Sequence, residues 1–213
     1  MNHIVNLFCS FRSPYSYLAT PGALQLDSDF EVSVAIRPVL PQALRQPDFF
    51  SAQNVKRARY IMMDWRRRAE MLGMPHRWPS PDPIVQDLKT YAIASDQPYI
   101  YRLTYLGVEA QRRGRGIAFA AEVSDVIFGG TRDWHMGNHL ADAAARAGLD
   151  LASMDEAIEG PAPHKADVEA NQRALDKTGH WGVPTFEFRG EPFFGQDRID
   201  TLRWRVEKEG MKR

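Results

Sequence analysis

The chain has 213 residues, of which 44% are hydrophobic and 25% are charged. These values suit one globular domain, or one domain with a large insertion, and they exclude an intrinsically disordered chain. Lysine plus arginine and aspartate plus glutamate both number 27, so a formal charge of zero gives no general attraction to nucleic acid or to an anionic membrane.

The first 42 residues predict a strand, a helix and a second strand. Residues 4–9 are an apolar run of strand length, and Ser13-Pro14 is typical of a helix start. Apolar side chains then occupy every second position of residues 30–37, which is the pattern of a strand with one buried face. Pro38 ends this run.

The last segment predicts a β-hairpin followed by a helix. Residues 183–188 indicate a strand, residues 189–191 a turn and residues 192–195 a second strand. Asp197 is a candidate cap of the final helix. The apolar face of that helix is marked by Ile199, Leu202 and Val206.

Between these segments, apolar residues recur at three- and four-residue steps, which predicts a series of helices. The order is therefore β-α-β, a helical middle, and β-β-α. We expect an α/β fold in which residues 1–42 and 170–213 form one discontinuous domain that contains the sheet. Residues 43–169 would form an all-helical insertion beside it.

Ser13 is the first candidate for chemistry. Since Pro14 suits the first helical position, Ser13 is the expected N-cap, and capping without catalysis is the simpler interpretation. The same geometry also suits an anion, because a helix N-terminus carries partial positive charge and free N–H groups. A hydroxyl at this position can donate a hydrogen bond to a thiolate and lower the pKa of the thiol.

Other patterns favour plainer interpretations. His135 and His139 have the spacing of two metal ligands on a helix, but no third ligand accompanies them, so we expect no metal site. Residues 66–68 and 112–115 are basic runs that indicate solvated helix surface at zero net charge, and we expect no nucleic-acid partner.

One cysteine, Cys9, permits no internal disulfide, and we expect it to be buried and inert. No apolar stretch approaches the roughly 20 residues that a bilayer-spanning helix needs, and the N-terminus has no signal-peptide core. These features together predict a soluble cytoplasmic protein with no membrane partner.

Four stretches of the chain carry a resemblance to a known family. They are residues 11–19 (FRSPYSYLA), 58–65 (ARYIMMDW), 181–186 (WGVPTF) and 193–198 (FFGQDR). The chain resembles the 2-hydroxychromene-2-carboxylate isomerases and their relatives, the kappa-class glutathione transferases. The resemblance covers nearly the whole chain and implies a thioredoxin-like domain with a helical insertion, a homodimer, and glutathione as the cofactor.

The resemblance also implies roles for individual residues. The catalytic serine of the family falls at Ser13, and in redox members of this fold two cysteines stand where Ser13 and Ser16 stand here. A cis proline falls at Pro184 and turns the backbone of Val183 toward the cysteinyl unit of glutathione. The glutathione-binding residues implied in this way are Val183, Pro184, Gln196, Asp197, Arg198, Asp48 and Arg57.

Three positions depart from the family pattern. Asp48 stands where the family tends to have an asparagine that binds glutathione or substrate, and Arg57 stands where it has a lysine. Ser10 stands where an acidic residue is common. These departures affect the ligand-binding loop and point to a different substrate.

The reaction implied by the resemblance is a reversible conjugate addition. Glutathione thiolate adds to the electron-poor double bond of a cyclic hemiketal acid, the ring opens, a bond rotates and the thiolate leaves. A basic group should hold the carboxylate of this aromatic acid substrate, and Arg57, Arg12 and Arg37 are the candidates. Trp181, next to the proline loop, is a candidate for the wall of the substrate pocket.

Two alternatives remain open at this point. The first is a kappa-like glutathione transferase that conjugates electrophiles and consumes glutathione. The second is a non-catalytic binding protein that keeps the fold without the chemistry.

Overall fold

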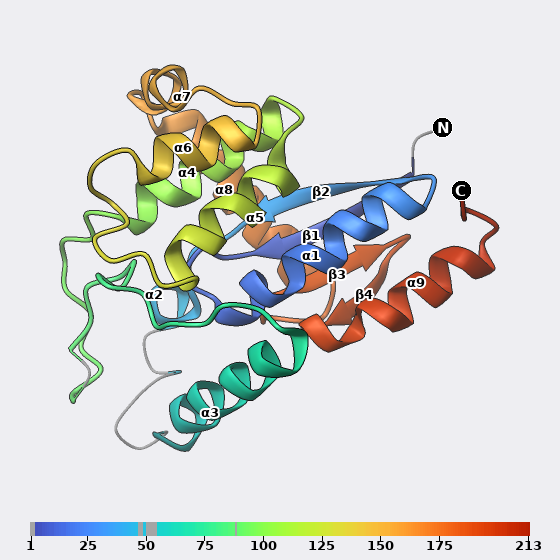
Figure 1. The fold of residues 1–213 in the computed structure, drawn as a ribbon, viewed down its shortest axis with the longest axis horizontal. Coiled ribbons are helices and arrows are strands. Elements are labelled where there is room, and N and C mark those ends of the chain that lie inside the picture. The colour runs from blue at the N-terminus through green and yellow to red at the C-terminus, as the bar shows by residue number, and fades with distance from the viewer. Residues whose placement is uncertain (1–2, 47–48, 50–54, 88) are drawn as a thin grey trace.

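A computed structural model describes residues 3–46, 49, 55–87 and 89–213 (Figure 1). A four-stranded mixed sheet lies at the centre, with the strand order β2-β1-β3-β4. The strands are β1 (His3–Cys9), β2 (Val32–Pro38), β3 (Thr185–Phe188) and β4 (Glu191–Phe194). The predicted β-α-β…β-β-α order and the α/β fold class are therefore confirmed.

Strand β1 holds the sheet together because it pairs with both halves of the chain. It runs parallel to β2 and antiparallel to β3, so Leu7 lies opposite Ile36 on one side and Phe186 on the other. All three side chains are buried. The antiparallel register also places Phe8 opposite Thr185, so the end of β1 meets the start of β3.

Helices cover both faces of the sheet. Helices α1 (Pro14–Asp29) and α9 (Ile199–Lys208) contact each other and lie on one face, while α8 (Ala162–Lys177) lies behind the strands (Figure 1). On the α8 side, Phe8 packs with Val39 and Leu175 in a small separate cluster. This arrangement explains why β1 is apolar at consecutive positions, since both of its faces are covered.

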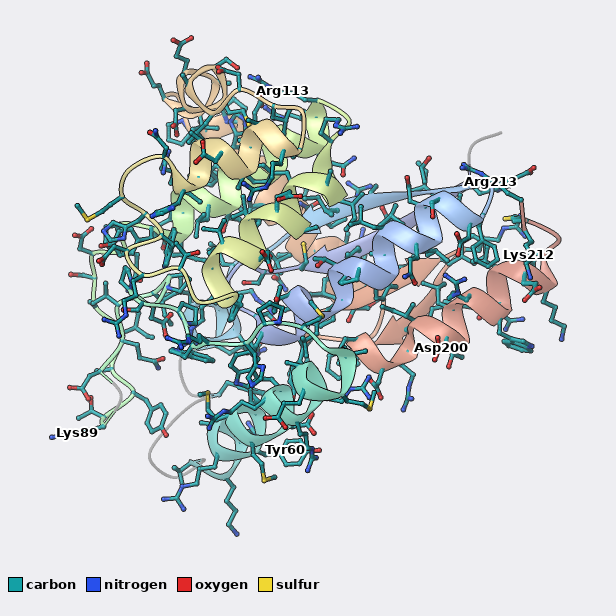
Figure 2. All side chains as sticks on the ribbon, viewed as in Figure 1. Tyr60, Lys89, Arg113, Asp200, Lys212 and Arg213 are labelled. Carbon is teal, nitrogen blue, oxygen red and sulfur yellow. The ribbon has the colours of Figure 1, made fainter. Side chains whose placement is uncertain are left out.

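The helices between β2 and β3 share the core of the sheet domain. They are α2 (Gln42–Arg45), α3 (Val55–Leu72), α4 (Ile100–Arg112), α5 (Gly116–Phe128), α6 (His139–Arg146) and α7 (Leu151–Ile158), together with α8. Helices α4, α5 and α8 all contact β2, and α5 also packs against α1. Arg113, at the top of Figure 2, donates hydrogen bonds to the Ser153 hydroxyl and carbonyl and so ties the end of α4 to α7.

Helix α8 runs without interruption across residues 169 and 170, where we expected the insertion to end. One continuous hydrophobic core includes residues of the sheet, of α1 and of α3 to α7. Across the part of the chain that the structure describes, no helix combines the length and apolarity needed to cross a membrane.

Gly107 provides a test of this shared core, because at this position α4 lies close to Phe11, in the segment before α1. A Cβ atom at Gly107 would lie 2.6 Å from Phe11 Cε2 and 3.1 Å from Pro38 Cγ. Overpacking of this kind costs about 1–3 kcal/mol, which outweighs the gain of about 1 kcal/mol from replacing a helical glycine by alanine. We expect Gly107→Ala to lower the free energy of unfolding in urea by up to about 2 kcal/mol.

Gly160→Ala is the matched control, because nothing lies within 4 Å of a Cβ atom at that position. We expect this control to stay within about 0.5 kcal/mol of the wild type. A Gly107→Ala variant more stable than this control would show that Phe11 yields without cost, because only the gain in helix propensity would then remain.

Candidate active-site cleft

A cleft of about 910 Å³ opens where the first turn of α1, helix α3 and the loop before β3 come together. Most of the site residues expected from the sequence line it. They are Arg12, Ser13, Arg57, Trp181, Val183, Pro184, Gln196 and Asp197. Arg37 and Arg198 are not among the described residues that line the cleft, and Asp48 lies outside the described residues.

Ser13 is the N-cap of α1, as its place before Pro14 predicts. Its backbone is extended, and its Oγ accepts a hydrogen bond from the Ser16 N–H at 3.1 Å. Among the described residues, no group accepts the Ser13 hydroxyl proton, so this O–H is available to a ligand. The helix is 16 residues long, and its first turn adds partial positive charge at the same point.

The loop before β3 presents the unpaired backbone of one residue, Val183, to the cleft. The Val183–Pro184 peptide bond is cis. The Val183 side chain packs against the cluster of Phe8 and Leu175 on the α8 side. Neither the N–H nor the C=O of Val183 has a hydrogen-bond partner in the described part of the chain. This residue can therefore pair with the backbone of an extended ligand.

The turn after β4 is tied to that loop. The Gly195 N–H donates to the Pro184 carbonyl at 2.9 Å. Gly195 has a φ of 109°, which favours glycine, and a Cβ atom there would lie 2.4 Å from Asp197 Oδ1. The Asp197 carboxylate therefore lies close to the backbone of Gly195, in the turn at the rim of the cleft.

Asp197 does not cap α9, contrary to the expectation from the sequence. A short 3-10 turn, Gln196–Arg198, comes first, and α9 begins at Ile199 with Arg198 at its N-cap and no side-chain cap. The Asp197 carboxylate instead lies 3.3 Å from Arg198 Nη1, and both side chains are about half exposed.

Arg12 lines the cleft, but its charge is already neutralised. Its Nε and Nη2 both donate to the Asp82 carboxylate at 3.0 Å, and its guanidinium lies 5.3 Å from the centroid of the Trp78 ring. The Trp78 Nε1–H also donates to Asp82. This ion pair fixes the loop after α3 against the start of α1.

The other two arginines that we considered for a substrate carboxylate lie in different surroundings. Arg57, on α3, is exposed, and its guanidinium lies 4.6 Å from the centroid of the Phe49 ring in the wall of the cleft. Arg37 lies on β2 and donates to the Asn6 side chain at 2.9 Å, outside the cleft.

Aromatic rings form the rim next to the proline loop. The His180 ring stacks on Phe194 with 3.8 Å between the ring centroids. The centroid of the Trp181 ring lies 5.3 Å from that of His180 and 5.0 Å from that of Phe49. Trp181 and Phe194 are both more than 40% exposed. This rim presents exposed aromatic rings at the mouth of the cleft.

Two polar residues of α3, Asp64 and Arg68, line the cleft, and neither was among the site residues expected from the sequence. The Tyr15 hydroxyl donates to Asp64 Oδ2 at 2.7 Å, across 49 positions of sequence. Burial and this hydrogen bond raise the pKa of Tyr15, so it remains a neutral phenol. Burial opposes ionisation of Asp64, but the hydrogen bonds from Tyr15 and Arg67 outweigh it and hold the pKa of Asp64 below its usual value.

Arg68 is the second such residue of α3. Its Nη2 donates to the Gln196 Oε1 at 2.9 Å, across 128 positions of sequence. The three-residue basic run at residues 66–68 indicated only helix surface. Amphipathic spacing could have found Arg68, since it follows the buried Trp65 by three positions and lies on the inner side of the helix.

Comparisons with known proteins agree with this fold. Residues 4–207 match the family described as the DSBA-like thioredoxin domain. No curated protein matches the chain in sequence.

Solved structures match over nearly the whole chain at low identity. A 2-hydroxychromene-2-carboxylate isomerase has a TM-score of 0.69 at 19% identity, over 96% of this chain and 95% of that one. A probable DsbA oxidoreductase from Streptomyces coelicolor has a TM-score of 0.65 at 18% identity, over 97% and 89%. The cytosolic disulfide reductase DsbM from Pseudomonas aeruginosa, solved with GSH, has a TM-score of 0.56 at 16% identity, over 97% and 98%.

Cys9 lies at the end of β1, four residues before Ser13, and is buried. Burial raises the pKa of its thiol to about 12, so the reactive thiolate is scarce at neutral pH. We expect no measurable reaction of native protein with a thiol reagent such as DTNB at pH 8, and full reaction in denaturant. Rapid labelling of the native protein would contradict this placement.

His180 should make the stability of the proline loop depend on pH. The Gly182 N–H donates to His180 Nδ1 at 3.0 Å, and burial lowers the pKa of His180. The folded state therefore prefers the neutral ring. The stabilisation that the neutral His180 ring gives to the folded state is complete above the pKa of histidine in the unfolded chain, about 6.5. It is lost as the pH falls below that value.

His180→Asn tests this pH dependence, because an asparagine side chain can also accept a hydrogen bond from the backbone N–H of Gly182 but does not titrate. We expect the free energy of unfolding of the wild type to fall relative to this variant between pH 7 and pH 5. Parallel pH profiles of the two proteins would contradict the assignment.

Proposed function

The chain belongs to the DSBA-like thioredoxin domain family, and we propose that it is a glutathione-dependent isomerase within this family. Its substrate would be 2-hydroxychromene-2-carboxylate or a related cyclic hemiketal acid, and its product the open-chain trans-o-hydroxybenzylidenepyruvate or its analogue. This reaction belongs to the degradation of aromatic compounds.

One observation carries the proposal. The free hydroxyl of Ser13, the N-terminus of α1 and the unpaired backbone of Val183 line one cleft. A hydroxyl donor beside a helix N-terminus stabilises an anion, and an unpaired backbone next to a strand holds an extended peptide. A short peptide that carries a thiol meets both conditions at once.

The polar groups of the cleft fit such a peptide. Gln42 lines the cleft, and its Oε1 is buried without a hydrogen-bond partner in the described structure. A buried acceptor of this kind is costly unless a ligand donates to it, and a peptide N–H would do so. Ser13, Val183 and Gln42 together offer a hydroxyl donor, a backbone pair and an amide acceptor.

Bound glutathione would supply a thiolate that adds to the electron-poor double bond of the substrate and is released after the bond has rotated. Ser13 donates its O–H toward the sulfur, and the first turn of α1 adds its partial positive charge. A free thiol near pKa 8.5 is only a few per cent ionised at neutral pH, and each unit of depression is worth about 1.4 kcal/mol. These two groups together can lower the pKa of the thiol by roughly one to two units.

A dithiol redox cycle does not fit this chain, although solved structures of similar fold include disulfide oxidoreductases. Ser13 and Ser16 stand at the corner of the first strand and helix, and the single cysteine, Cys9, is buried in β1. The sulfur must therefore arrive with a ligand. The fold of an isomerase that matches 96% of this chain, and a similar fold solved with GSH, support the same proposal.

The serine that would activate the thiol gives the first test. Removing one anion-stabilising donor costs about 2–4 kcal/mol of transition-state stabilisation. We expect Ser13→Ala to lower kcat/KM for the isomerisation by the corresponding factor of roughly 30 to 1,000.

Ser13→Gly is the matched control for the structural role of the cap. Glycine at an N-cap costs only a few tenths of a kcal/mol, whereas alanine costs about 1 kcal/mol. Both variants should lose activity equally while the glycine variant keeps its stability. If the glycine variant instead keeps both its stability and its activity, the Ser13 hydroxyl acts only as a helix cap.

The fate of glutathione separates the proposed isomerase from a transferase. With a small, fixed amount of glutathione, an isomerase turns over many equivalents of the hemiketal acid and the free thiol remains constant. Loss of one thiol for each product molecule would show a transferase instead.

A further inference from the structure

Arg68, on α3, lines the cleft and has no direct ion pair, although its charge helps to lower the pKa of Asp64 on the same helix. Its Nη2 donates to Gln196 Oε1 at 2.9 Å, and its Nη1 contacts the Met71 sulfur, a weak acceptor, at 3.3 Å. Its Nε is buried and has no partner in the described structure. No carboxylate of the described residues forms an ion pair with it.

This state differs from that of the other partly buried arginine in the cleft. Arg12 donates two hydrogen bonds to the Asp82 carboxylate, which neutralises its charge. A buried guanidinium N–H without an acceptor is unfavourable, and an arginine with such a spare donor is suited to an anion that enters from outside.

Gln196 adds a second donor next to Arg68. Its side chain lines the cleft with 8% of the residue exposed, and its Oε1 is occupied by Arg68. Its Nε2 has no hydrogen-bond partner among the described residues. A guanidinium and an amide N–H side by side match the two oxygens of a carboxylate.

The charge of the surrounding cleft favours a monoanion. Asp64 and Asp197 also line the cleft, and Asp64 is held ionised. A doubly charged phosphate would meet stronger repulsion from these two groups than a carboxylate does.

We propose that Arg68 and Gln196 form a carboxylate-binding subsite of the cleft. This inference rests on the proposed function, in which both ligands carry carboxylates: glutathione has two, at its glutamyl and glycyl ends, and the hemiketal acid has one. Arg68 is a binding residue here, since it orients a ligand through its carboxylate while Ser13 faces the sulfur.

Arg68→Met tests the subsite, and Arg66→Met is its matched control. Arg66 lies on the same helix, is exposed and does not line the cleft, so its replacement removes the same charge from another face. Calorimetry with four separate probes would measure binding to the wild type and to both variants. The probes are glutathione, γ-glutamylcysteine, cysteinylglycine and the hemiketal acid.

We expect Arg68→Met to weaken the binding of at least one probe by about ten- to a hundredfold, the effect of losing one charged hydrogen-bond donor. Arg66→Met should leave all four unchanged. The pattern identifies the carboxylate. If only glutathione and γ-glutamylcysteine bind more weakly, the subsite holds the glutamyl carboxylate of glutathione. If only glutathione and cysteinylglycine bind more weakly, it holds the glycyl carboxylate. If only the hemiketal acid binds more weakly, it holds the carboxylate of the substrate.

The proposal is overturned if Arg68→Met binds all four probes as the wild type does, or if Arg66→Met weakens them equally. A wild type that binds no glutathione rejects the proposed function, and the hemiketal acid then decides the subsite alone. A wild type that binds none of the probes rejects both. If Arg68→Met does not fold, Arg68→Gln, which keeps a polar group beside Gln196, replaces it under the same criteria.

Discussion

The antiparallel pairing of β1 with β3 is the interaction on which the cleft depends. Its register places Phe8 opposite Thr185, so the chain leaves β1 toward Ser13 at the edge where it enters β3 from Val183. Two segments about 170 positions apart thus meet because of a backbone ladder between buried strands. The hydrogen bond from Gly195 to Pro184 then brings the turn after β4 to the same edge.

A strand ladder of this kind specifies its register firmly when both faces are buried. A shift by one residue would exchange Leu7, which lies in the main hydrophobic core, with Phe8, which packs with Leu175 of α8 in the separate cluster. The hydrophobic core therefore fixes the geometry of the polar site. Val183 illustrates this coupling, since its side chain belongs to the Phe8 cluster while its backbone remains unpaired at the cleft.

The electrostatics of the cleft follow from which charges the protein neutralises itself. Arg12 is held by Asp82, and Asp64 is held by Tyr15 and Arg67, so these groups build the walls. The hydroxyl of Ser13 and the guanidinium of Arg68 have spare hydrogen-bonding capacity. The corner at Ser13 and Ser16 carries no cysteine, so in the proposed function the thiol comes from a ligand.

The sequence by itself determined the features that depend on neighbouring residues. The alternation in β2, the hairpin of β3 and β4, and the cap of α1 at Ser13 are written in local periodicity and turn residues, and all three appear in the structure. Only the tertiary structure decided which polar side chains meet, because such contacts depend on distances between elements. It paired Arg12 with Asp82 and Arg68 with Gln196, 70 and 128 positions apart, and it left Arg37 on β2 away from the cleft.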